Sequence, residues 1–239
     1  MIDGQLPHIW RDHLFLLLHQ AQGQEVFLPM NQYEKPYLIT AEVPSPELSE
    51  GVDASARHQK KKSSSGFEIN ALTRRLKRYV YEKQISDVYS LVREICEKNG
   101  WPYASIDYDP LRYQFMNRTQ MQELPKRGHR LASHTMTHRI LRFLSEEEKE
   151  YELVESKKRL ESQLDHAVDI LVYPYGSRAE VDKASIRAAA EAGYQTGLMN
   201  IRRHSLTPAD LTQPRFALPP VVDAAHLHTI VSGYKFLFR

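Results

Sequence analysis

Apolar residues recur every three or four positions between Phe67 and Asn99, the spacing expected for one face of an α-helix. The first group is Leu72, Leu76 and Val80, and the second is Val88, Leu91, Val92 and Ile95. Ser86 can cap the second segment at its start, and Asn99-Gly100 can end it. The pattern predicts two packed helices here, and a leucine-rich stretch predicts a shorter amphipathic helix from Trp10 to Gln20.

In the second half of the chain, strand-like apolar runs alternate with helix-like ones. The predicted strands are 129–134, 169–175, 194–200 and 215–222; the predicted helices are 117–127, 145–164, 179–192 and the stretch from 224 onward. Ser145 and Glu148 form a capping box that should open the second of these helices. Regular alternation of this kind is typical of parallel βα units, whose functional groups collect after the carboxyl ends of the strands. His134 and Tyr175 both follow such ends.

Residues 41–66 differ in character from their surroundings, because they contain prolines, serines, lysines and almost no large apolar residue. This composition predicts an exposed loop. We therefore expect two parts: residues 1–112 carry a helical insertion and the loop 41–66, and residues 113–239 form the βα core.

Composition narrows the class of protein. With 239 residues, 41% hydrophobic and 26% charged, the chain is an ordinary globular α/β protein, and a net charge of +2 argues against a nucleic-acid surface. No apolar stretch is long enough to span a bilayer, and the start of the chain lacks the pattern of a signal peptide. Oligomeric state and localisation stay open: the protein is cytoplasmic, or is associated with the cell envelope if the true N-terminus lies upstream.

Two histidines four positions apart, His134 and His138, are the leading candidates for chemistry. On a helical turn this spacing puts both side chains on one face, where they can hold one metal ion. Thr135, Thr137 or a nearby carbonyl could bind the second ring nitrogens. With 11 histidines in the chain, chance alone gives about 0.5 such pairs, so the surrounding motifs must decide.

Four motifs follow one another in the second half. They are Gly128–His138, which contains Ser133-His134-Thr135-Met136-Thr137-His138, then Leu144–Glu148, then Tyr173-Pro174-Tyr175-Gly176, and then Ala192–Thr196. In order and spacing this set resembles the polysaccharide deacetylases, the NodB-like group of carbohydrate esterase family four. The resemblance covers about residues 113 to 222.

The resemblance implies a distorted, incomplete (β/α) barrel. It also implies that His134 and His138, together with an aspartate, bind a divalent metal, with zinc as first candidate, which polarises the acetyl carbonyl and activates water. Tyr173, Pro174, Tyr175 and Gly176 would line the substrate groove, and the backbone N–H of Tyr175 would help to hold the developing oxyanion. The implied substrate is an N-acetylated polysaccharide or oligosaccharide, deacetylated by hydrolysis of a carbon–nitrogen bond.

The chain departs from the family pattern at its start. Family members open with a strand ending in Thr-Phe-Asp-Asp-Gly, which supplies the ligand aspartate and the general base, and this motif is absent here. Ile2-Asp3-Gly4 resembles the stretch just after the family's second strand, so we expect the first β-α-β unit to be missing. Asp107 and Asp109 are possible substitutes, although their setting beside Pro110 favours a surface turn.

Three further positions bear on the resemblance. Tyr173 stands where many members have an arginine, Arg215 could be an arginine before the final strand, and Leu227-His228 matches the family's late motif only in its letters.

Two alternatives to a deacetylase remain at this point. Loss of the opening unit favours a truncated, catalytically impaired member or a non-catalytic carbohydrate-binding remnant. A basic run at Gln59–Lys62 would instead suit an interaction protein, whose partner binding would depend strongly on salt.

Overall fold

The computed structural model describes residues 14, 17–40, 67–101, 103, 116–201 and 210–215. The predictions for residues 41–66, 107–109, 216–222 and 224 onward lie outside these ranges, as does much of the helix predicted from Trp10 to Gln20, of which residues 14 and 17–20 are helical. Two compact units divide the described residues. The first holds those up to Gln84 and from Val88 to Tyr103, and the second holds Ile85–Asp87 and those from Met116 on. The division predicted between residues 112 and 113 stays a prediction.

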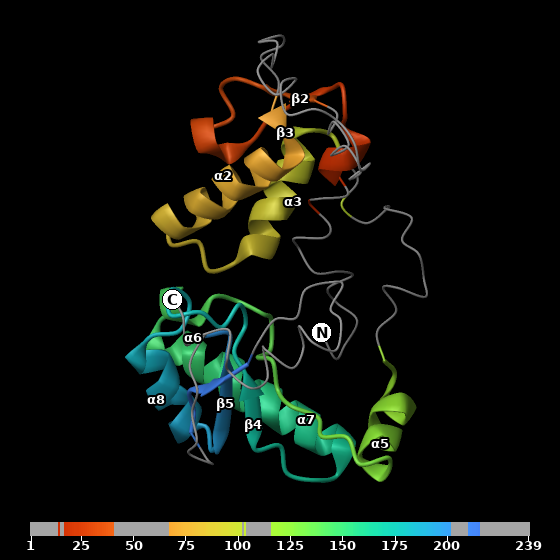
Figure 1. Ribbon diagram of the computed structural model, residues 1–239, viewed down its shortest axis with the longest axis vertical. Coiled ribbons are helices and arrows are strands. Elements are labelled where there is room, and N and C mark those ends of the chain that lie inside the picture. The colour runs from red at the N-terminus through yellow and green to blue at the C-terminus, as the bar shows by residue number, and fades with distance from the viewer. Residues whose placement is uncertain are drawn as a thin grey trace, which may run out of the picture. The chain divides into compact units, whose positions relative to one another are not determined.

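The first unit combines a small sheet with the two helices that the apolar spacing predicted. Strand β1 (Glu25–Val26) pairs antiparallel with β2 (Tyr37–Thr40), which pairs in parallel with β3 (Phe67–Glu68), and a 3-10 turn, η1 (Pro29–Asn31), follows β1. The helices are α2 (Ile69–Glu82) and α3 (Val88–Lys98) (Figure 1). The predicted apolar faces of both helices are buried, which confirms these two elements.

A parallel sheet forms the centre of the second unit. Strand β4 (Ile170–Val172) pairs with β5 (Thr196–Met199), and β5 pairs with β6 (Gln213–Pro214), all in parallel. On the other side of β4, Ser133 forms a parallel bridge with Leu171. The predicted parallel βα arrangement is therefore confirmed for this unit.

The helices of this unit follow the predicted order. They are α5 (Arg118–Lys126), the 3-10 turn η3 (Leu141–Phe143), α6 (Glu146–Glu150), the π-helical turn η4 (Tyr151–Glu155), α7 (Ser156–Leu164) and α8 (Lys183–Glu191). Ser145 and Glu148 form the predicted capping box. The predicted helix 145–164 is thus present, but a π turn interrupts it.

Several predicted elements differ in extent from those observed. Strands β4 and β5 are shorter than the predicted 169–175 and 194–200, and β6 lies just before the predicted 215–222. Two further predictions are wrong by more. The strand 129–134 is reduced to the bridge at Ser133, because Gly128 turns the chain at φ +82° and the following His129 and Arg130 are exposed. The helix expected from 179 begins only at Lys183, because the Asp182 side chain caps it by accepting from the Ser185 N–H. Before that cap, the Glu180 carboxylate accepts from the Ser177 N–H and holds a turn.

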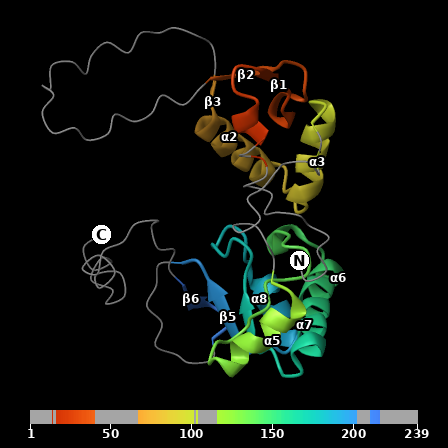
Figure 2. The ribbon, with the colours of Figure 1, turned by 90° about the vertical axis from the view of Figure 1, so that its right-hand side faces the viewer.

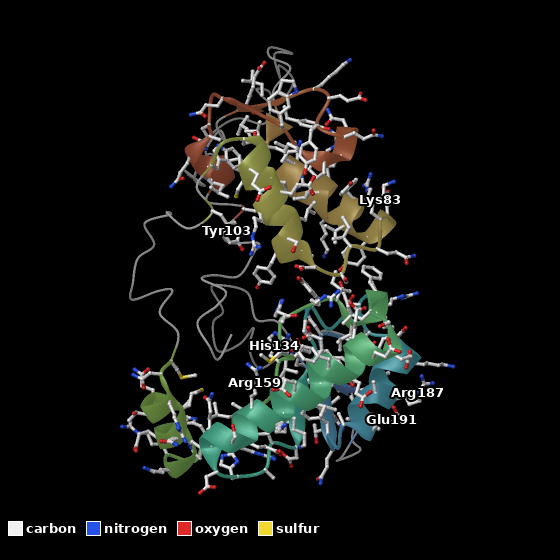
Figure 3. All side chains as sticks on the ribbon, turned by 180° about the vertical axis from the view of Figure 1, so that it is seen from behind. Lys83, Tyr103, His134, Arg159, Arg187 and Glu191 are labelled. Carbon is white, nitrogen blue, oxygen red and sulfur yellow. The ribbon has the colours of Figure 1, made fainter. Side chains whose placement is uncertain are left out.

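Helices α6, α7 and α8 lie to one side of β5 and β6 (Figure 2), and α6 contacts α8. Arg187 of α8, drawn beside Glu191 in Figure 3, pairs with Glu146 of α6 at 2.8 Å. The core between helices and sheet includes Leu153, Leu171 and Tyr173. The fold is mixed α/β, as predicted, and no helix in the described ranges is long and apolar enough to cross a membrane.

Gly197 of β5 is required by close packing. A Cβ atom there would lie 2.3 Å from the carbonyl oxygen of Leu211 and 2.7 Å from the Tyr173 ring. The β5–β6 pairing and the burial of Tyr173 therefore both depend on a residue without a side chain.

We expect Gly197→Ala to lower the free energy of unfolding by about 3 kcal/mol, because backbone must move to admit the methyl group. Gly128→Ala is the matched control: its Cβ would meet nothing within 4 Å, so only its positive φ contributes, about 1 kcal/mol. Urea denaturation followed by circular dichroism measures both. Equal losses in the two variants would contradict the packing argument.

Candidate functional site

The structure brings His134 and His138 together at the carboxyl end of the parallel sheet. Their ring centroids are 4.8 Å apart with an interplanar angle of 77°, and the Tyr175 ring lies 5.0 Å from that of His138. The pair lies on an irregular turn between Ser133 and η3, so the helical turn invoked for the four-residue spacing is wrong. Figure 3 labels His134 on this segment.

His134 is oriented by strand β4. Its Nδ1–H donates to the Val172 carbonyl oxygen at 2.5 Å, which leaves the lone pair of Nε2 available for a ligand. Val172 is in reach because Ser133 pairs with β4 on both sides: the Ser133 N–H donates to Ile170, and the Val172 N–H donates to the Ser133 carbonyl. The acceptor for this imidazole is therefore a carbonyl, one of the predicted alternatives.

His138 has a buried ring nitrogen, Nδ1, with no hydrogen-bond partner in the described part of the chain. Burial, followed by the neighbouring His134, lowers the pKa of His138 to about 4. Loss of hydration also lowers the pKa of His134, and the charge of Arg215 adds to this effect. Both rings are therefore neutral at pH 7, the form in which imidazole binds metals.

The histidine pair fits a divalent cation as two of its ligands. One ring has a fixed tautomer, and the other has a buried nitrogen whose polarity no described protein atom satisfies. Within the described ranges, no three side chains of His, Cys, Asp or Glu converge, so a third protein ligand is not found among those residues.

Left-handed backbone conformations gather at this site. Thr135, His138 and Tyr175 have φ values of +65°, +61° and +60°. Such conformations cost about 1–3 kcal/mol each for residues other than glycine, and a β-branched threonine is especially unfavourable there. The Thr135 hydroxyl compensates in part, since it accepts from the His138 N–H at 3.1 Å.

The predicted substrate-binding stretch, Tyr173 to Gly176, is mostly buried. Tyr173 has no exposed surface and packs against Gly197, and Pro174 and Gly176 are buried too. The Asn200 N–H donates to the Gly176 carbonyl, which ties the stretch to the end of β5. Tyr175 alone among the four presents a partly exposed side chain, and it is the one beside His138.

An apolar cavity of about 220 Å³ borders the two histidines. Its lining includes Met121, Leu131, Met136 and Leu160 together with His134 and His138. No pattern along the chain indicates this cavity, because its lining comes from three separate segments.

Glu152 is a site residue that the sequence interpretation missed. It is only 1% exposed, and its carboxylate accepts from the backbone N–H groups of Met136 and Thr137, between the two histidines. One signal was available: Glu152 lies in phase with Leu153, Ser156 and Leu160 on the buried side of the predicted helix.

Known proteins include relatives of this chain in sequence and in structure. The Bacillus subtilis (strain 168) protein YxkH, named as a polysaccharide deacetylase, is 29% identical over 83 residues, which are 35% of this chain and 29% of YxkH. The chain thus spans less than a third of that relative. The structure of the Streptococcus pyogenes deacetylase PplD superposes on 60% of this chain with a TM-score of 0.42. The matched region is 65% of the PplD chain, and the sequence identity is 20%. The polysaccharide deacetylase BC0361 from Bacillus cereus covers 61% and 48% at 16% identity and a TM-score of 0.43.

A model of the family described as polysaccharide deacetylase matches residues 72–197, more than half of the 239 residues. The match begins within α2, so it includes helices that the sequence pattern assigned to an insertion. It also spans the turn between His134 and His138, called the histidine turn below, and the Tyr-Pro-Tyr-Gly stretch. By this match the chain belongs to the polysaccharide deacetylase family.

Proposed function

We propose that this chain acts as a metal-dependent hydrolase that removes acetyl groups from N-acetylated sugars of a polysaccharide or oligosaccharide. Membership of the deacetylase family supports the reaction class. The observation that carries the proposal is the approach of two neutral imidazoles, one of them fixed by the Val172 carbonyl, beside Tyr175.

In this proposal His134 and His138 hold a divalent cation, with zinc as first candidate. When bound, such a cation supplies Lewis-acid polarisation of the acetyl carbonyl and a nucleophile at neutral pH. The lone pair of His134 Nε2 is directed by the bond at Nδ1, and burial keeps His138 unprotonated. The two side chains therefore offer ligands that need not lose a proton first.

Tyr175 is the proposed contact between the site and the acetyl group. Its left-handed backbone turns the chain beside the His138 ring, where its N–H is proposed to stabilise negative charge on the acetyl oxygen. Tyr173, Pro174 and Gly176 are proposed to support this residue from behind, because they are buried and anchored to β5. The incomplete (β/α) barrel remains part of this proposal.

Asp107 and Asp109, the substitutes considered from the sequence, lie outside the described residues, as does the basic run at Gln59–Lys62. The non-catalytic alternative gains no support from the family match.

Acetate release from N-acetylated oligosaccharides tests the reaction. We expect His134→Ala and His138→Ala each to lower kcat/KM at least 100-fold, which corresponds to about 2.7 kcal/mol of transition-state stabilisation. His129→Ala, an exposed histidine on the same segment, serves as the control and should keep the wild-type rate. Wild-type rates in both site variants would refute the proposed centre.

Zinc binding tests the ligands directly. Calorimetry on the metal-free chain should show weak binding, because no carboxylate among the described residues joins the two imidazoles, and the affinity should fall at least tenfold in His134→Ala. Tight, stoichiometric zinc in the double variant His134→Ala, His138→Ala would place the metal elsewhere.

The lowered pKa values make metal binding resistant to acid. Protons compete with metal only below the pKa of the folded imidazole, so binding should persist below pH 6.5, and the contribution of His138 should be lost only toward pH 4. Imidazoles with the ordinary pKa of about 6.5 would already lose affinity below pH 6.5. Cobalt titrations followed by absorbance at several pH values distinguish lowered from ordinary pKa values. Loss of half of the cobalt binding at about pH 6.5 would contradict the lowered pKa values.

A further inference from the structure

Glu152 faces the histidine turn and not solvent. One carboxylate oxygen accepts from the Met136 N–H at 2.9 Å and from the Thr137 N–H at 2.8 Å, and the other accepts from the Thr137 hydroxyl. The backbone carbonyl of Glu152 also accepts from the Met136 N–H, at 3.1 Å. Glu152 therefore binds the two residues at the centre of the His134–His138 segment by both its side chain and its backbone.

The π-helical turn η4 (Tyr151–Glu155) gives Glu152 this orientation. A π turn adds a residue to the helix and leaves backbone carbonyls to find new donors. Here the Leu153 carbonyl accepts from the Ser156 hydroxyl at 3.1 Å and from the Tyr194 hydroxyl at 3.0 Å. Ser156 in turn is 2.9 Å from the hydroxyl of Ser133, the residue before His134. Buried hydroxyl groups thus hold the irregular part of the helix beside the site.

The segment that Glu152 holds would not keep its conformation by local preference alone. Thr135 and His138 both have left-handed backbones, and the bond from the His138 N–H to the Thr135 hydroxyl is internal to the turn. Backbone that is locally unfavourable persists only where surrounding contacts determine it. The bonds from Met136 and Thr137 to Glu152 supply those contacts.

We infer that Glu152 is a positioning residue, which keeps His134 and His138 facing each other by accepting hydrogen bonds from the turn between them. The inference rests on the proposed function, because it takes the pair to be metal ligands. The role is that of an acceptor with defined geometry, and a negative charge is not required for it.

Glutamine at position 152 separates geometry from charge. Its carbonyl oxygen can accept from both N–H groups, and its amide can donate to the Thr137 hydroxyl, which reverses that bond without loss. Alanine removes every side-chain acceptor. The matched control is Glu155→Ala, on the same π turn, where the carboxylate pairs with Arg159 near the surface.

Two measurements on the full chain test the inference. The first is amide hydrogen exchange at Met136 and Thr137 in metal-free protein; the second is affinity for zinc alone, by calorimetry. For Glu152→Ala we expect at least tenfold faster exchange and at least tenfold weaker zinc binding, the range typical of groups that orient metal ligands. Glu152→Gln should stay within threefold of wild type in both, and Glu155→Ala should match wild type.

Each other outcome has a defined meaning. Wild-type exchange and affinity in Glu152→Ala would overturn the inference, and so would a Glu152→Gln as impaired as Glu152→Ala, since charge would then be required. If Glu152→Ala does not fold, Thr137→Val takes its place. We expect at least threefold weaker zinc binding in Thr137→Val and restored binding in Thr137→Ser. Wild-type zinc affinity in Thr137→Val would overturn the inference. A wild-type chain that binds no zinc would refute the proposed function, while the exchange rates would still decide the role of Glu152.

Discussion

The backbone pairing of Ser133 with β4 is the interaction on which the site depends. Two hydrogen bonds, from Ser133 to Ile170 and from Val172 to Ser133, bring the chain beside the sheet at the point where the strand ends. His134 follows directly, so its imidazole reaches the Val172 carbonyl. Without this pairing, neither the tautomer of His134 nor the position of the turn after it would be defined.

Two kinds of support meet at the histidine turn. The sheet holds one end through Ser133, and the interrupted helix holds the middle through Glu152. Both supports are buried polar groups whose hydrogen bonds are made, and such groups favour a unique arrangement because an unpaired alternative is costly. At η4 the helix departs from regular α-helical hydrogen bonding. The hydroxyl groups of Ser156 and Tyr194 donate there to the Leu153 carbonyl oxygen.

The electrostatics and the packing around His134 and His138 both favour neutral imidazoles. Burial keeps His138 neutral, and an apolar cavity lies against both imidazoles. Two neutral imidazoles with free nitrogen lone pairs are suited to a cation, the role proposed for them above. The left-handed residues Thr135, His138 and Tyr175 mark where the chain departs from its local preferences to reach this arrangement.

Local rules were enough for the helices and for the order of the strands. Apolar spacing located α2 and α3, the pattern at Ser145 located the start of α6, and the alternation of segments indicated parallel pairing. The motif order was enough to indicate the family. These features depend on contacts between residues close in sequence, or on residue types that the family requires, and both can be read from the chain itself.

Tertiary structure decided the rest. The burial of Tyr173 depends on Gly197. The strand predicted at 129–134 is reduced to Ser133, the residue whose backbone pairs with β4, and the π turn lies beside Ser156 and Tyr194. In the sequence Glu152 is one of several acidic residues in a charged helix. In the folded chain it accepts hydrogen bonds from Met136 and Thr137. Partners far apart in sequence determine each of these features, and a linear pattern carries no information on which distant groups will meet.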